Sequence, residues 1–181
     1  MQKIAQEFGE RVDVEPRSFL LRPEPDATAT FTSYRDMHWR QAQAQEEAGE
    51  FTIPSIGTPL PSGSFPGQEA AKAAKHQGTA LFRAYHARLF KAFFQEHRNL
   101  TERAVLEELA AEVGLDLELF RADLQSGACR EEVIADHLEA VSRYGITGIP
   151  TVIVDGKEAI VGAVPTEVYR SVITRLLEAQ P

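Results

Sequence analysis

One cysteine and five histidines are the side chains of this chain best suited to nucleophilic or metal chemistry. Cys129 lies just before a helical segment, where the positive end of the helix dipole favours a thiolate. Reactivity would also require exposure, and a dithiol cycle requires a second thiol that resolves the mixed disulfide. Cys129 is therefore interpreted as a spare thiol and not as a redox centre.

The histidines show none of the paired spacings of metal sites, such as two ligands at positions i and i+4 beside a carboxylate. They are His38, His76, His86, His97 and His137. We therefore expect no metal site and no cofactor.

The strongest local pattern is a stretch near the C-terminus that is punctuated by glycine and proline. It reads Gly145-Ile146-Thr147-Gly148-Ile149-Pro150-Thr151-Val152-Ile153-Val154-Asp155-Gly156-Lys157. Gly145 suits the left-handed residue that closes a helix, and Pro150 suits the mouth of a strand because proline has no N–H to donate. Asp155-Gly156 suits a hairpin turn with two positive φ angles. The pattern predicts a loop onto Pro150, a strand, a tight turn and a second strand over residues 158–161.

This stretch, with Ala159-Ile160-Val161-Gly162-Ala163 and a closing helix from Pro165, resembles the C-terminal half of a DsbA-family thioredoxin fold. Within that family it is most similar to the FrnE-like branch, which Arg17-Ser18-Phe19-Leu20-Leu21-Arg22-Pro23 also resembles. The resemblance covers nearly the whole chain. It implies an α/β, thioredoxin-like fold with a large all-helical insertion. It also implies that Pro150 is a cis-proline facing a Cys-x-x-Cys pair, which this chain lacks together with the family's first strand.

The elements expected along the chain fit that organisation. Alternating and continuous apolar residues predict an edge-like strand over residues 12–21. Helices are expected at residues 33–48, 69–96, 101–114, 116–127 and 130–144, the third capped by Thr101 and the fourth by Asp116. Aromatic residues at 82–94 are assigned to the core, and Val133, Ile134, Leu138, Val141 and Tyr144 are expected to face inward. The thioredoxin-like domain would then comprise residues 1–32 and 145–181, discontinuous and incomplete, with a helical insertion domain at residues 33–144.

The missing first strand matters for stability. In the family's fold it lies between the strands matching residues 12–21 and 151–154. Such a strand contributes about five buried apolar side chains at roughly 1.5–3 kcal/mol each, which is comparable with a domain's total stability of about 5–15 kcal/mol. We therefore expect that the chain is either an N-terminally shortened form of a longer protein or completes its sheet with a partner chain. A homodimer is among the candidate assemblies.

Composition limits the cellular setting. The 181 residues are 43% hydrophobic and 25% charged, which suffices for a buried core. The net charge of −8 argues against nucleic-acid binding, and no apolar run is long enough for a membrane span. The first residues lack the apolar core of a secretion signal, and a single thiol fits a reducing compartment. The expected location is the cytoplasm.

Three functions are compatible with these patterns. The favoured one is a DsbA-like thiol–disulfide oxidoreductase whose redox cysteine pair is absent from this chain. The resemblance assigns a catalytic role to Pro150 and substrate binding to Thr147, Gly148 and Ile149, with a protein or small-molecule thiol or disulfide as substrate. This chain alone is not expected to carry out dithiol chemistry.

Two alternatives stay open. One is a glutathione-dependent isomerase or transferase of the kappa-like branch, although Val161-Gly162-Ala163-Val164-Pro165 matches the FrnE-like pattern better than the Trp-Gly-x-Asp-Arg pattern of that branch. The other is a non-catalytic module that binds extended peptides by strand addition.

Overall fold

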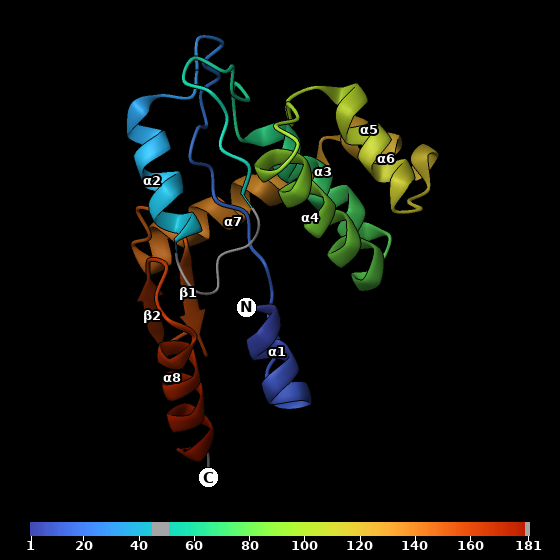
Figure 1. The fold of residues 1–181 in the computed structure, drawn as a ribbon. Coiled ribbons are helices and arrows are strands. Elements are labelled where there is room, and N and C mark those ends of the chain that lie inside the picture. The colour runs from blue at the N-terminus through green and yellow to red at the C-terminus, as the bar shows by residue number, and fades with distance from the viewer. Residues whose placement is uncertain (45–50, 180–181) are drawn as a thin grey trace. The chain divides into compact units, whose positions relative to one another are not determined.

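The computed structural model describes residues 1–44 and 51–179, and it divides the chain into two compact units. Unit 1 comprises Met1–Phe19 and Asp136–Pro181, and unit 2 comprises Leu20–Ala135. Helices dominate both units, and the described residues contain one two-stranded sheet (Figure 1). This helix-rich α/β architecture confirms the expected fold class, whereas the expected domain bounds remain a prediction.

Unit 2 is helical. Its helices are α2 (Ser33–Gln43), α3 (Phe65–His76), α4 (Thr79–Phe94), α5 (Arg103–Glu112) and α6 (Leu117–Ser126), followed by the start of α7 (Ala128–Tyr144). Helices α3 to α7 contribute to one apolar core, in which Tyr85, Leu109 and Phe120 are fully buried. The Tyr85 hydroxyl donates a hydrogen bond to the carbonyl of Leu106 at 3.0 Å, so the buried phenol is satisfied. The predicted aromatic core is correct for Phe82 and Tyr85, whereas Phe93 and Phe94 are only partly buried and Phe90 is 53% exposed.

Two expected helix boundaries in unit 2 are wrong. Residues 69–96 form two helices, because Gln77 ends α3 and Gly78 takes a φ of 109° that no α-helix can contain. Helix α5 starts at Arg103, and Thr101 donates its hydroxyl to Asn99 instead of capping the helix. By contrast, Asp116 caps α6 as expected by accepting from the N–H groups of Glu118 and Leu119. The helix expected at residues 33–48 is α2, and the end of that prediction lies outside the described residues.

Unit 1 brings together helices from the two ends of the described chain. Helix α1 (Gln2–Phe8) runs into a 3₁₀ turn, η1 (Gly9–Arg11), and packs against the last helix, α8 (Thr166–Glu178). Ile4, Phe8 and Ile173 form the small core between them. An ion pair between Glu7 and Arg170 joins the two helices at the surface.

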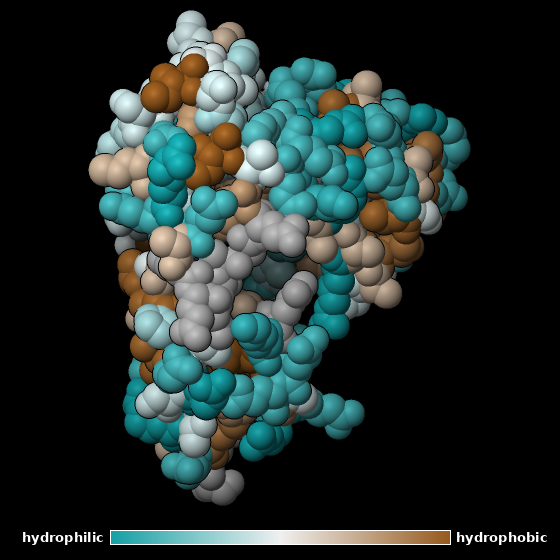
Figure 2. Space-filling view, viewed as in Figure 1, coloured by the Kyte–Doolittle hydropathy of each residue, from teal (hydrophilic) through white to brown (hydrophobic). Residues whose placement is uncertain are grey.

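The sheet of unit 1 is the predicted hairpin. Strands β1 (Thr151–Val154) and β2 (Glu158–Val161) pair antiparallel, with Val152 opposite Ile160. The turn has φ values of 53° at Asp155 and 66° at Gly156, as a mirror-image turn requires. Ile160 is 7% exposed, whereas Val161 on the opposite face is 69% exposed. Hydrophobic surface over the hairpin is visible as brown at the left edge of Figure 2.

The strand expected at residues 12–21 does not form. This segment is extended, but no strand among the described residues pairs with it. Pro16 lacks an N–H, and the N–H of Ser18 donates to the carboxylate of Asp136 instead of to a neighbouring strand. A side chain of α7 therefore replaces a strand as the partner of this backbone.

The predicted inward face of α7 is also largely wrong. Val133 is fully buried, but Ile134, Leu138 and Val141 are 37%, 57% and 46% exposed. The helix is rotated so that Asp136 is buried in place of Leu138, because the Asp136 carboxylate receives the hydrogen bond from Ser18. An apolar stripe is thereby left at the surface of the helix.

Candidate functional site

The loop between α7 and β1 holds the residues to which the sequence analysis assigns substrate contacts. Gly145 closes α7 with a φ of 62°, and Thr147, Ile149 and Pro150 lie exposed beyond it. The peptide bond between Ile149 and Pro150 is cis. These residues lie together because they are neighbours in the chain. The substrate-binding role of Thr147, Gly148 and Ile149 and the catalytic role of Pro150 stay predictions.

Two hydrogen bonds fix both sides of this loop. The Thr151 hydroxyl donates to the carbonyl of Gly148 at 2.8 Å, and the N–H of Gly162 donates to the carbonyl of Pro150 at 2.8 Å. The first bond closes the loop onto the start of β1, and the second ties it to the end of β2. Ile149, 51% exposed, is thus presented on an anchored backbone.

Strand β1 has an open edge next to this loop. The bond from Gly162 to Pro150 sets the alternation of the antiparallel ladder, so Val152 also bonds across to β2 whereas Thr151 and Ile153 do not. The N–H and C=O groups of Thr151 and Ile153 therefore point to the edge opposite β2. In the part of the chain that the structure describes, no strand pairs with that edge.

Cys129 is unsuited to thiol exchange in this fold. It is 1% exposed within the core of unit 2. Burial, assisted by the charges of Asp123, Glu132 and Glu69, raises the pKa of its thiol to about 11. The helix dipole that the sequence analysis considered does not prevail over burial. The thiol is therefore protonated at neutral pH.

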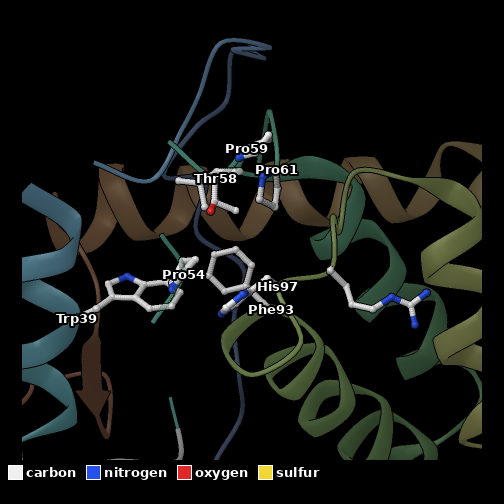
Figure 3. Close-up of a pocket in the computed structure, with 9 residues that line it drawn as sticks. Trp39, Pro54, Thr58, Pro59, Pro61, Phe93 and His97 are labelled. Atoms are coloured by element: carbon white, nitrogen blue, oxygen red, sulfur yellow. The ribbon is translucent and has the colours of Figure 1, made fainter. Parts of the chain in front are cut away.

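Two hollows are lined by residues other than those of the loop. In unit 2, Trp39, Pro54 and Phe93 face one another around a cavity of about 10 Å³ that Pro59, Pro61 and His97 also line (Figure 3). That volume is roughly what one water molecule needs, so the cavity is part of the packing of this unit.

The second hollow, about 330 Å³, is in unit 1 between the end of α7 and the hairpin turn, lined by Arg143, Tyr144, Ile153 and Lys157 among others. The sequence analysis missed it, because the charged residues that line it show no spacing that predicts a site. Arg143 and Lys157 are already paired with Glu139 and Asp155, so the hollow presents no free cation of the described chain to a ligand.

Metal ligands and membrane-spanning helices can be sought in the described part of the chain. Among residues 1–44 and 51–179, no three His, Cys, Asp or Glu side chains are grouped as metal ligands. Within the same residues, no helix has the length and hydropathy that crossing a bilayer would need.

Comparison with known proteins identifies a matching family and a similar bacterial protein. The DSBA-like thioredoxin domain family matches residues 1–174. An uncharacterized protein of Bacillus subtilis (strain 168), YwbO, is 30% identical over 172 residues, which cover 92% of this chain and 83% of that protein.

Solved structures share the fold. A candidate protein disulfide isomerase from Nitrosomonas europaea superposes with a TM-score of 0.78 at 18% identity, over 99% of this chain and 89% of that one. The cytosolic disulfide reductase DsbM from Pseudomonas aeruginosa gives a TM-score of 0.66 at 26% identity, over 99% of this chain and 88% of that one. DsbM has also been solved with GSH, and that structure gives a TM-score of 0.67 at 24% identity over 99% of this chain and 89% of that one.

Proposed function

Because the chain belongs to the DSBA-like thioredoxin domain family, we propose that it is the substrate-binding part of a thiol–disulfide oxidoreductase. Its substrates are extended polypeptides or small molecules that carry a thiol or a disulfide. They bind at the loop formed by Thr147, Gly148, Ile149 and Pro150. The FrnE-like branch remains the subgroup that we propose for it.

The observation that carries this proposal is that the Ile149 side chain is exposed on a backbone that hydrogen bonds hold in place. Its side chain is half exposed, while the backbone on either side is held by the bonds to Gly148 and Pro150. A fixed, exposed backbone segment at the end of a strand can pair with an extended peptide without ordering itself first, which reduces the entropic cost of binding.

The reaction itself requires groups beyond those of the described chain. In thiol–disulfide exchange a thiolate attacks one sulfur of a disulfide, the other sulfur leaves as a thiolate, and a second thiol resolves the mixed disulfide. The sequence offers Cys129 alone, whose thiol is buried and has a raised pKa. The 181-residue chain is therefore proposed to bind substrate and not to turn it over unaided.

Glutathione is the second candidate ligand. The DsbM structure with GSH supports it, and the description of DsbM as a cytosolic reductase also supports our proposal that this chain acts in the cytoplasm. A tripeptide thiol would use the same loop. A second copy of the chain remains a candidate partner, and it would use the open edge of β1.

Binding of a fluorescent, cysteine-containing peptide to the full 181-residue chain tests the proposal. We expect Ile149→Asp to weaken binding by about tenfold or more, since it places a desolvated charge against an apolar contact. Leu119→Asp is the matched control, because Leu119 is 57% exposed on α6, and it should leave affinity unchanged. Equal affinity of the Ile149→Asp protein and the wild type would overturn the proposed site.

Two further measurements separate the alternatives. Competition by glutathione for the peptide indicates a glutathione-using protein, whereas peptide binding without competition indicates a polypeptide substrate. Insulin reduction with dithiothreitol should not exceed the rate without protein. A clear acceleration would contradict the view that Cys129 is inert.

A further inference from the structure

His76 lies at the end of α3 between two carboxylates from different helices. Its Nδ1 atom is 3.1 Å from Oδ2 of Asp123 on α6, and its Nε2 atom is 2.6 Å from Oε1 of Glu132 on α7. All three side chains are between 32% and 40% exposed. One imidazole ring therefore joins α3 to both α6 and α7.

The chemistry of the ring determines its protonation state in this position. A neutral imidazole has one N–H donor and one lone pair, and a carboxylate can only accept a hydrogen bond. With a carboxylate at each nitrogen, the neutral ring would satisfy one contact and place a lone pair against the other carboxylate. Only the imidazolium ion donates to Asp123 and Glu132 together.

A second cation lies near Glu132. Lys72, 6% exposed, has its Nζ atom 3.9 Å from Oε2 of Glu132, at a longer distance than the histidine. Glu69 is engaged by Arg130 at 2.8 Å. The charged groups of this region are Glu69, Lys72 and Lys75 on α3, Asp116 and Asp123 at α6, and Arg130, Glu131 and Glu132 on α7.

Partial burial lowers the pKa of His76, but the hydrogen bonds to Glu132 and Asp123 prevail and the net shift is upward. A histidine whose pKa is raised on folding stabilises the fold fully below its unfolded pKa, about 6.5, and loses that contribution as the pH rises through the folded value. The contact is thus strong in acid and weak in alkali.

We propose that His76 is a pH-sensitive clasp that holds the end of α6 and the start of α7 against α3. Closed, it protects the core of unit 2 at the α6–α7 junction. Open, after loss of one proton, it allows that junction to separate from α3. Cys129 reports on this motion, because it is buried at the start of α7 and senses the charges of Asp123 and Glu132.

The alkylation rate of Cys129 by iodoacetamide tests the proposal on the full chain between pH 5.5 and 8.5. Each rate is divided by the rate of the same protein unfolded in guanidinium chloride at the same pH, which removes the intrinsic ionisation of the thiol for molecules that react after the junction has opened. We expect the protection of the wild type to fall about two- to fivefold across this range, as suits a partly exposed charge pair. Protection that is constant with pH would overturn the clasp.

Substitutions assign the effect to the ring. His76→Gln should give low protection that no longer varies with pH, and His38→Gln, on the exposed surface of α2, should keep the wild-type profile. If His76→Gln does not fold, Glu132→Gln serves instead, since removal of one carboxylate lowers the pH at which protection is lost. A wild-type pH profile in either folded clasp variant contradicts the proposal. The nitrogen chemical shifts of His76 provide an independent check, because both nitrogens should carry protons at pH 6.

Discussion

The carboxylate of Asp136 accepts a hydrogen bond from the backbone N–H of Ser18 at 2.8 Å, although 118 residues separate the two. Asp136 and Ser18 are both 6% exposed, so the bond is shielded from water. Arg17 adds a second contact to the same carboxylate at 3.0 Å from a side chain that is 54% exposed. Together these contacts hold the extended N-terminal segment of unit 1 on α7.

The burial of these groups predicts an order of effects. Asp136→Ala removes the acceptor of a buried N–H and should lower the free energy of unfolding by about 1–3 kcal/mol. Arg17→Ala removes only a half-exposed ion pair and should cost less than about 1 kcal/mol. Urea denaturation of both variants measures the difference. A larger effect for Arg17→Ala would mean that charge and not the buried hydrogen bond holds the segment.

The open edge of β1 predicts an alternating pattern of amide exchange. The N–H of Val152 bonds within the hairpin and should exchange slowly, whereas those of Thr151 and Ile153 face the open edge and should exchange quickly. Hydrogen exchange followed by NMR checks this residue by residue.

Slow exchange at Ile153 that grows with protein concentration would instead mean that a second copy pairs with the edge. Sedimentation of the same samples would then give the mass of a dimer. Slow exchange without a change in mass would contradict the open edge.

Two glycines allow the effect of backbone conformation on stability to be separated from the effect of side-chain crowding. Gly127, between α6 and α7, has a φ of 84°, and a β-carbon there would meet no atom within 4 Å. Gly127→Ala should therefore destabilise the protein through backbone conformation alone, by about 1–2 kcal/mol. Gly67→Ala places its β-carbon in ordinary contact with Leu100 at 3.5 Å inside α3 and should be neutral or slightly stabilising. Thermal unfolding of both variants tests the contrast, and equal losses would contradict it.

The buried phenol of Tyr85 should make the free energy of unfolding depend on pH in alkaline solution. Burial raises the pKa of its phenol, so the folded protein keeps the proton above about pH 10, where the unfolded chain releases it. Its contribution is complete below that pH and declines above it. Tyr85→Phe should cost about 1 kcal/mol at pH 7 through the lost bond to Leu106, and should make unfolding less steeply pH-dependent above pH 10. Denaturation at pH 7 and pH 10.5 checks both parts.

Sequence reasoning succeeded where local chemistry decides the structure. The hairpin follows from Asp155 and Gly156, which need positive φ, and the start of α6 follows from the short side chain of Asp116. Resemblance to the family supplied the fold class and directed attention to the Pro150 loop. These features depend on residues that are neighbours in the sequence.

Prediction from the sequence failed where contacts between residues far apart in the sequence determine the structure. The face that α7 buries depends on Asp136, whose partner Ser18 no periodicity reveals. His76 has no metal-like spacing because Asp123 and Glu132 lie 47 and 56 residues away. For α7, apolar spacing predicted the helix, but the buried polar contact of Asp136 accompanies a different buried face.

The burial of Cys129 has a practical consequence for labelling. Because that thiol is enclosed and protonated at neutral pH, a cysteine placed at exposed Ile149 would react with disulfide reagents much faster than Cys129. The Ile149→Cys protein could then be cross-linked to the proposed thiol or disulfide substrates without removal of the native cysteine. Because Cys129 is enclosed, the wild-type sequence is a suitable background for disulfide-trapping experiments.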